Sequence, residues 1–248
     1  MRSKRSGWSA AAAVGFWALM SGTAAGAQPQ PLAYWPMEAV EQGVVADASG
    51  HGYDATAHGV EGRLPEVVEG IVGKALSFSA QDEQYLQVGK TEGLAAPEAF
   101  TVMAWIKPLA RGATYEIIGS KGDKSGEPPW PGWRFRYFWT RVVLQFGTED
   151  GKEPSAGTPE WSVMQGLWSH VAATCDGQRL ALYVNCNLLA SQDANLPIMP
   201  SPRPFIIGNY IGRKNAYAFN GIVDELKVFG EALPEDRIFA EAIRGMPE

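Results

Sequence analysis

The alternation of apolar and polar positions predicts short β-strands along most of the chain. Turn-forming Gly, Pro, Asn and Asp residues separate the apolar runs every 8–12 residues, and helices do not alternate with the strands. This spacing is typical of an all-β, two-sheet antiparallel sandwich. The expected strands are 32–37, 70–78, 85–88, 100–108, 115–120, 133–139, 142–146, 168–175, 179–184, 205–208 and 221–229.

One short C-terminal helix is predicted over 234–244. Pro234 suits the first helical position, and Glu235 and Asp236 favour the first turn. The helix is expected to place four apolar side chains on one side: Ile238, Phe239, Ala242 and Ile243.

The strand 221–229 carries an acid where an apolar residue is expected. With a period of two, Asp224 shares one face with Ile222, Leu226 and Val228. A buried, unpaired carboxylate costs several kcal/mol or more. Asp224 therefore needs a cation, a ring of hydrogen-bond donors or exposure to solvent.

The segment 133–139 has an aromatic face and a basic face. The aromatic face is expected to be core because large rings bury much apolar area. Its residues are Trp133, Phe135, Tyr137 and Trp139. Arg134 and Arg136 are then expected on an exposed sheet face, where guanidinium forks suit the carboxylates or sulfates of an acidic glycan. Pairing with neighbouring acids is the alternative.

The segment 168–185 predicts a hairpin that turns at 176–178 and pairs Cys175 with Leu180. Cys186 then lies roughly 20 Å from Cys175, beyond the roughly 7 Å that a disulfide spans. We predict two free, inward-facing thiols. Tyr183 falls on the opposite face, which is expected to form a small polar groove. Tyr183 is a candidate ligand contact, and so is Trp130 in a Pro/Gly-rich loop, which either stacks on a sugar or caps the sandwich.

The N-terminal segment has the organisation of a signal peptide. Basic residues at 2, 4 and 5 precede an apolar run over 10–20, and Ala25-Gly26-Ala27 forms a cleavage site. We predict a signal peptide at 1–27 and one domain at 28–248, exported to the periplasm or the extracellular space. An uncleaved anchor is the alternative.

The net charge of the chain limits the classes of partner that we expect. Removal of 1–27 leaves 18 basic and 27 acidic side chains, a net charge of −9. Nucleic acids and anionic membranes require basic patches. We therefore expect no nucleic-acid partner and no membrane insertion after cleavage, while the oligomeric state is not predicted.

Seven motifs in order resemble the laminin-G-like jelly-roll domains of the concanavalin A-like lectin/glucanase superfamily. They are Trp35-Pro36-Met37-Glu38, Asp47-Ala48-Ser49-Gly50-His51-Gly52, Gly73-Lys74-Ala75-Leu76-Ser77-Phe78, Phe100-Thr101-Val102-Met103-Ala104-Trp105-Ile106, Trp168-Ser169-His170-Val171-Ala172, Leu182-Tyr183-Val184-Asn185 and Gly221-Ile222-Val223-Asp224-Glu225. The resemblance implies two face-to-face sheets with adjacent first and last strands. This family usually has Gly after Tyr-Val-Asn, where this chain has Cys186; Asn185 or Asn187 is expected to adopt the left-handed conformation instead.

The resemblance also implies a structural Ca²⁺ between Asp47 and Asp224. Backbone carbonyls around Gly50 to Gly52 would supply further ligands, since Ca²⁺ takes six to eight oxygens. The alternative is that Asp224 accepts backbone N–H groups while Asp47 forms an Asx turn.

An enzyme of this superfamily needs catalytic carboxylates on one face of a strand, and the chain has no such arrangement in its sequence. Glucanase relatives carry a Glu-x-Asp-x-x-Glu strand or a close variant, which is not found in this sequence. The prediction is an exported, non-catalytic module that binds carbohydrate or a protein surface. The alternatives are a glycoside-active enzyme and a purely structural envelope protein.

Overall fold

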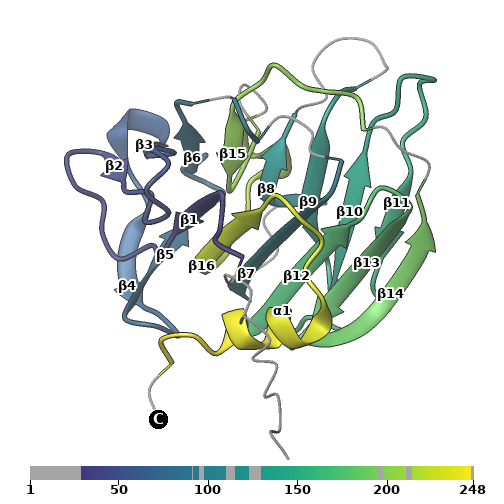
Figure 1. The fold of residues 1–248 in the computed structure, drawn as a ribbon. Helices are drawn as coiled ribbons and strands as arrows, with labels where there is room; N and C mark the ends of the chain where they lie inside the picture. Colours follow the sequence, from purple (N-terminus) through teal and green to yellow (C-terminus); the bar gives the residue numbers. More distant parts are fainter. Residues whose placement is uncertain are drawn as a thin grey trace, which may run out of the picture.

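The computed structural model describes residues 29–90, 92–94, 98–109, 115–122, 130–194, 198–210 and 214–246. These residues form two antiparallel sheets that pack face to face, the sandwich that the sequence predicts (Figure 1). The predicted signal peptide at 1–27 lies outside the described residues. Among the helices that are described, none has the length and apolar character needed to cross a bilayer.

Sheet A contains, in spatial order, β14 (Asn187–Asp193), β13 (Arg179–Val184), β12 (Ser169–Cys175), β7 (Phe100–Pro108), β16 (Gly221–Phe229), β5 (Lys74–Phe78) and β4 (Glu66–Glu69). The first strand, β1 (Ala33–Trp35), also pairs with β16. The first and last strands are therefore adjacent, as the family resemblance implies. Pro36, which lacks a backbone N–H, follows β1 directly at this edge.

Sheet B contains, in spatial order, β11 (Ser155–Gly157), β10 (Arg141–Phe146), β9 (Trp133–Phe138), β8 (Glu116–Lys121), β15 (Phe205–Ile207), β6 (Tyr85–Val88), β3 (Ala55–His58) and β2 (Val44–Val45). The remaining elements are the helix α1 (Glu235–Ala242) and the 3₁₀ helices η1 (Val60–Gly62) and η2 (Lys214–Tyr217).

The core between the sheets follows the predicted alternation in β9. Trp133, Phe135 and Tyr137 lie in the core, which confirms the aromatic face over these positions. Trp139 does not belong to the core: the strand ends at Phe138, and Trp139 occupies the turn with φ 62° and 49% of its surface exposed.

The faces of β16 differ from the period-two prediction because the strand contains a β-bulge. Its pairing with β7 shifts between Asp224 and Lys227, and Glu225 adopts φ 53°. An inserted residue reverses the alternation beyond it. The core face is consequently Val223, Leu226 and Val228, while Asp224 lies on the outside of sheet A.

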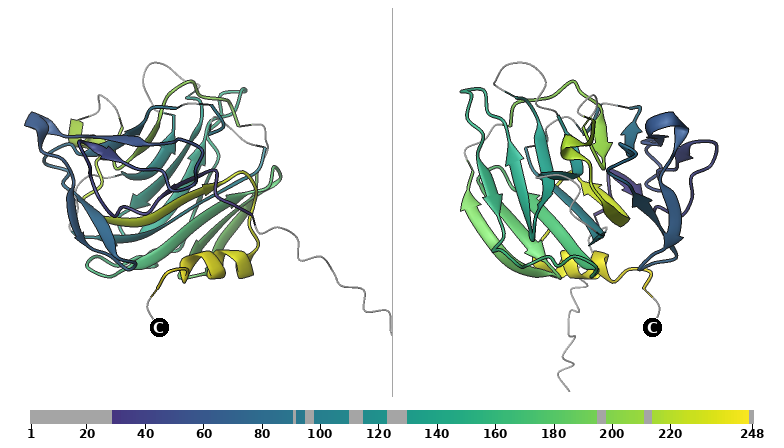
Figure 2. Two further views of the ribbon diagram at one scale, coloured as in Figure 1. Left: turned by 60° about the vertical axis from the view of Figure 1, so that its left-hand side comes forward. Right: turned by 180° about the vertical axis from the view of Figure 1, so that it is seen from behind.

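Helix α1 covers the outside of sheet A (Figure 2). Ile238 packs there in a small apolar cluster, and the indole N–H of Trp105 donates to the Ala242 carbonyl at 3.0 Å. The predicted apolar side is only half right, because Phe239 and Ile243 are exposed. Glu241 faces the sheet instead, since its carboxylate meets the buried ammonium of Lys227 at 3.5 Å.

The β12–β13 hairpin has the predicted register, with Cys175 opposite Leu180. Both cysteines are free, as predicted. Cys175 is buried in the core, but Cys186 is only half buried because it lies in the β13–β14 turn. Asn185 (φ 48°) and Cys186 (φ 64°) are both left-handed, as a two-residue type I′ turn requires.

Candidate functional site

The loop around Asp47 is held together by hydrogen bonds to that carboxylate. Oδ1 accepts the backbone N–H groups of Tyr34 and Ser49, and Oδ2 accepts the Ser49 hydroxyl and the Tyr53 N–H. Partial burial on its own would raise the pKa of Asp47, but these bonds together outweigh it and lower the pKa. Each oxygen therefore has two donors, which corresponds to the Asx-turn alternative.

Gly50 and Gly52 adopt positive φ angles of 82° and 76°, so they bend this loop as their sequence context indicates. The carbonyl of His51, between them, accepts a 2.9 Å hydrogen bond from the Lys90 ammonium. A cation from the protein itself thus contacts one of the carbonyls expected near calcium.

Asp224 is fully buried on the outside of sheet A, beneath the turn that joins β4 and β5. Its Oδ2 accepts the backbone N–H groups of Ile71 and Val72 at 2.8 and 3.1 Å. Its Oδ1 is buried and has no hydrogen-bond partner among the described residues. Burial raises the pKa of Asp224 to about 6, against the opposing effect of neighbouring backbone N–H groups.

The residues expected to hold calcium fit the ion in part. The Oδ1 of Asp224 is the atom that a cation would contact, whereas the oxygens of Asp47 are occupied by donors. Within the described ranges, no three His, Cys, Asp or Glu side chains gather in a metal-binding group. A calcium ion at Asp224 stays a prediction.

The two arginines of β9 are not exposed, and that expectation was wrong. Arg134 is 0% exposed, and its guanidinium donates to the Trp130 carbonyl at 2.9 Å and to Glu153 at 3.3 Å. Arg136 is 6% exposed, and its guanidinium lies 4.7 Å from the centre of the Tyr115 ring. Loops and neighbouring aromatic side chains that a single-strand pattern cannot show account for this burial.

The other two candidate contacts lie apart from each other. Tyr183 is 8% exposed and packs in the small apolar cluster beneath α1, so the polar groove expected around it is largely covered. Trp130 is half buried beside Arg134 on the sheet B side, where its carbonyl accepts the Arg134 hydrogen bond.

A pocket of about 300 Å³ lies beside the β9–β10 turn, and two tryptophans flank it. Trp161 is 69% exposed and Trp139 is 49% exposed. Both adopt left-handed backbone conformations, with φ 67° and 62°, which are rare for bulky residues and often mark functional positions. The backbone N–H of Trp161 donates to the Thr140 hydroxyl at 2.9 Å and holds the two turns together. The lining residues are Tyr137, Trp139, Thr140, Trp161, Met164 and Gln165.

The sequence interpretation missed this tryptophan pair. A signal was available in Trp161, which stands between Glu160 and Ser162 in a segment without strand periodicity. A large aromatic residue in a polar loop indicates either a cap on the core or an exposed contact surface. The structure shows exposure.

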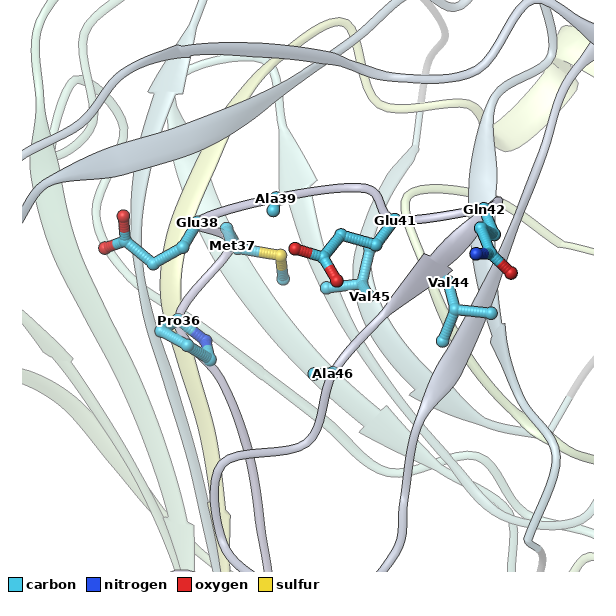
Figure 3. A pocket seen from close by; sticks show the side chains of 9 residues that line it. All are labelled: Pro36, Met37, Glu38, Ala39, Glu41, Gln42, Val44, Val45 and Ala46. Carbon is cyan, nitrogen blue, oxygen red and sulfur yellow. The ribbon is translucent and has the colours of Figure 1, made fainter.

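A second pocket, of about 430 Å³, lies along residues 36–46 (Figure 3). Its floor includes Met37 and Val45, and the Glu41 carboxylate lies beside them, whereas Glu38 extends away at the other end. The Glu38 carboxylate accepts the Lys74 N–H at 3.1 Å. Two acids and an apolar floor disfavour an anionic ligand here.

The comparisons with known proteins agree with this architecture. The sequence model of the concanavalin A-like lectin/glucanases superfamily matches residues 80–239. A search of curated proteins found no sequence match.

Similar solved structures include domain 4 of AbnA, an extracellular arabinanase from Geobacillus stearothermophilus in complex with arabinotriose. It has 19% identity and a TM-score of 0.65 over 86% of this chain and 98% of that chain. The binding domain of Paraclostridial Mosquitocidal Protein 1 has 19% identity and a TM-score of 0.64, with 84% of this chain and 50% of that one covered. The binding domain of botulinum neurotoxin DC in complex with SialylT has 15% identity and a TM-score of 0.59, with coverages of 85% and 50%. The chain thus spans about half the length of the toxin domains, and these likenesses establish the fold.

Proposed function

The chain belongs to the concanavalin A-like lectin/glucanases superfamily, and from that premise we propose that it is a non-catalytic module that binds carbohydrate. The observation that carries the proposal is the pair of exposed tryptophans at the β9–β10 pocket. An indole face offers an apolar surface to the C–H face of a sugar ring. Thr140 and Gln165, at the same pocket, offer hydrogen bonds to sugar hydroxyls.

The similar structures support a binding role. Two of them are binding domains of toxins, and the arabinanase domain was solved with arabinotriose. The basic n-region and apolar run at the N-terminus support export, and the arabinanase is itself extracellular. The structural calcium ion that the family resemblance implies between Asp47 and Asp224 remains part of the proposal, with the Oδ1 of Asp224 as the oxygen that it would contact.

The test is a glycan array probed with the protein and with its variants W161A and W139A. Loss of a well-exposed aromatic anchor is expected to weaken binding by at least about tenfold. F239A is the matched control. Phe239 is also a half-exposed aromatic residue, but it lies on α1, the helix that packs on sheet A. Binding that W161A leaves unchanged would contradict the site.

The same protein should be incubated with the glycans that it binds, and reducing ends should be measured. No release is expected from a binding module. Release of reducing ends that a single Asp or Glu substitution abolishes would identify an enzyme instead. Absence of both binding and release would favour a structural role.

A further inference from the structure

The outer face of sheet B holds a group of buried polar atoms that have no hydrogen-bond partner in the part of the chain that the structure describes. These atoms include the Ser120 hydroxyl oxygen, the Gln145 Oε1 and the Arg136 Nε. Ser120 and Gln145 are the direct cross-strand neighbours of Arg134, on β8 and β10 respectively. Arg136 lies two residues along β9 and therefore points to the same face. The three groups lie within two rungs of the sheet.

Arg136 stands out within this group. Its Nε is buried and has no hydrogen-bond partner among the described residues, and only 6% of Arg136 is exposed. The two terminal nitrogens of Arg134, on the same face, bind Glu153 and the Trp130 carbonyl. The contact that Arg136 does make is with the face of the Tyr115 ring. Burial lowers the pKa of Arg136, and the charge of Arg134 adds to that effect.

A largely buried positive charge whose Nε has no hydrogen-bond partner is costly, and an anion relieves that cost. The guanidinium fork matches a carboxylate or sulfate in geometry. The Ser120 hydroxyl can donate to the same group, and the Gln145 oxygen can accept from a neighbouring sugar hydroxyl.

Aromatic side chains connect Arg136 with the tryptophan pocket. Tyr115, which covers Arg136, stacks on Phe138 with ring centres 4.8 Å apart. Phe138 in turn lies 5.4 Å from Trp139, and the Arg141 guanidinium lies 5.2 Å from the Phe138 ring. The side chains that lie between the pocket and Arg136 are thus aromatic and basic.

We propose that Arg136 binds the carboxylate or sulfate of an acidic glycan whose neighbouring sugar occupies the tryptophan pocket. This inference rests on the proposed function, because it names the ligand class for the same surface. It gives Arg136 the role of a specificity determinant.

The test compares matched acidic and neutral probes. Oligogalacturonate is compared with its carboxyl-reduced form, and chondroitin sulfate with its desulfated form, by titration calorimetry. The wild-type protein is expected to prefer at least one acidic probe roughly tenfold or more. R136Q should lose that preference and keep its neutral binding, whereas W161A should weaken both. R63Q is the control, since the Arg63 side chain is exposed and pairs with Asp82.

A second measurement uses the wild-type protein alone, in case R136Q does not fold. The Arg136 Nε–H resonance is followed by NMR during titration with sodium sulfate, with sodium chloride as the control. A saturable shift with sulfate alone supports the anion site, even if no glycan binds and the proposed function fails. No saturable sulfate shift, together with equal affinity for acidic and neutral probes, would overturn the inference and leave water as the partner of these atoms.

Discussion

Replacement of Asp224 by Asn should change the pH dependence of stability in a predictable direction. The folded protein holds the Asp224 carboxyl with a pKa of about 6, against an ordinary value of 3.8. This group therefore stabilises the fold fully below about pH 4, and its contribution is lost as the pH rises past about 6. The difference of about two pH units corresponds to about 3 kcal/mol.

The amide that the D224N substitution introduces cannot ionise, so the difference between the two proteins isolates this titration. Its oxygen can still accept the Ile71 and Val72 N–H groups that Asp224 Oδ2 accepts. The free energy of unfolding would be measured by urea titration with EGTA, between about pH 3 and pH 8. Wild-type stability minus D224N stability should fall by about 3 kcal/mol over this range. A difference that does not change with pH would refute the assignment of a raised pKa.

Calcium supplies the second arm of this experiment. If an ion binds the Oδ1 of Asp224, calcium should stabilise the wild-type protein at pH 8 and leave D224N unchanged. EGTA should then lower the wild-type melting temperature and calcium should restore it. Identical melts with calcium and with EGTA would exclude a stabilising ion at Asp224.

Two further predictions concern sheet A. C186G should raise the free energy of unfolding by about 1 kcal/mol or less. Glycine removes the strain of a left-handed conformation, but it also has more conformational freedom in the unfolded chain, which offsets part of the gain. A lower melting temperature would show that the thiol, 4.0 Å from the His170 Nδ1, stabilises the turn instead. K227M should cost about 3–5 kcal/mol, since Lys227 is the cation between the buried acids Glu225 and Glu241, at 3.0 and 3.5 Å. Urea unfolding checks this second prediction, and a loss below about 1 kcal/mol would contradict it.

The sequence was sufficient for the sandwich but not for the surroundings of single side chains. Alternation in 133–137 identified the core face of β9 because the aromatic side chains at every second position all reach the core. The same reasoning failed in β16, since nothing in the composition of 221–229 shows that Glu225 takes a left-handed conformation. One such residue moves Asp224 from the expected core face to the outside of the sheet.

The burial of side chains on the outer faces of the sheets could likewise not be predicted from the sequence. Arg134 and Arg136 were correctly placed opposite the aromatic face, but their burial depends on side chains far away in sequence, such as Glu153 and Tyr115. The orientation of α1 depends on Lys227, which draws Glu241 toward the sheet and leaves Phe239 outside. Long-range ion pairs of this kind do not alter the pattern of apolar and polar positions, so that pattern cannot predict them.

Helix α1 has a practical consequence for how the protein can be displayed. It packs on the outside of sheet A, while the arginines lie on β9 of sheet B and the tryptophan pair flanks the β9–β10 turn. A bead, fluorophore or fused enzyme attached after the helix would be held behind sheet A (Figure 2). The side that carries sheet B would then face outward, which suits a tether after α1 for immobilised assays.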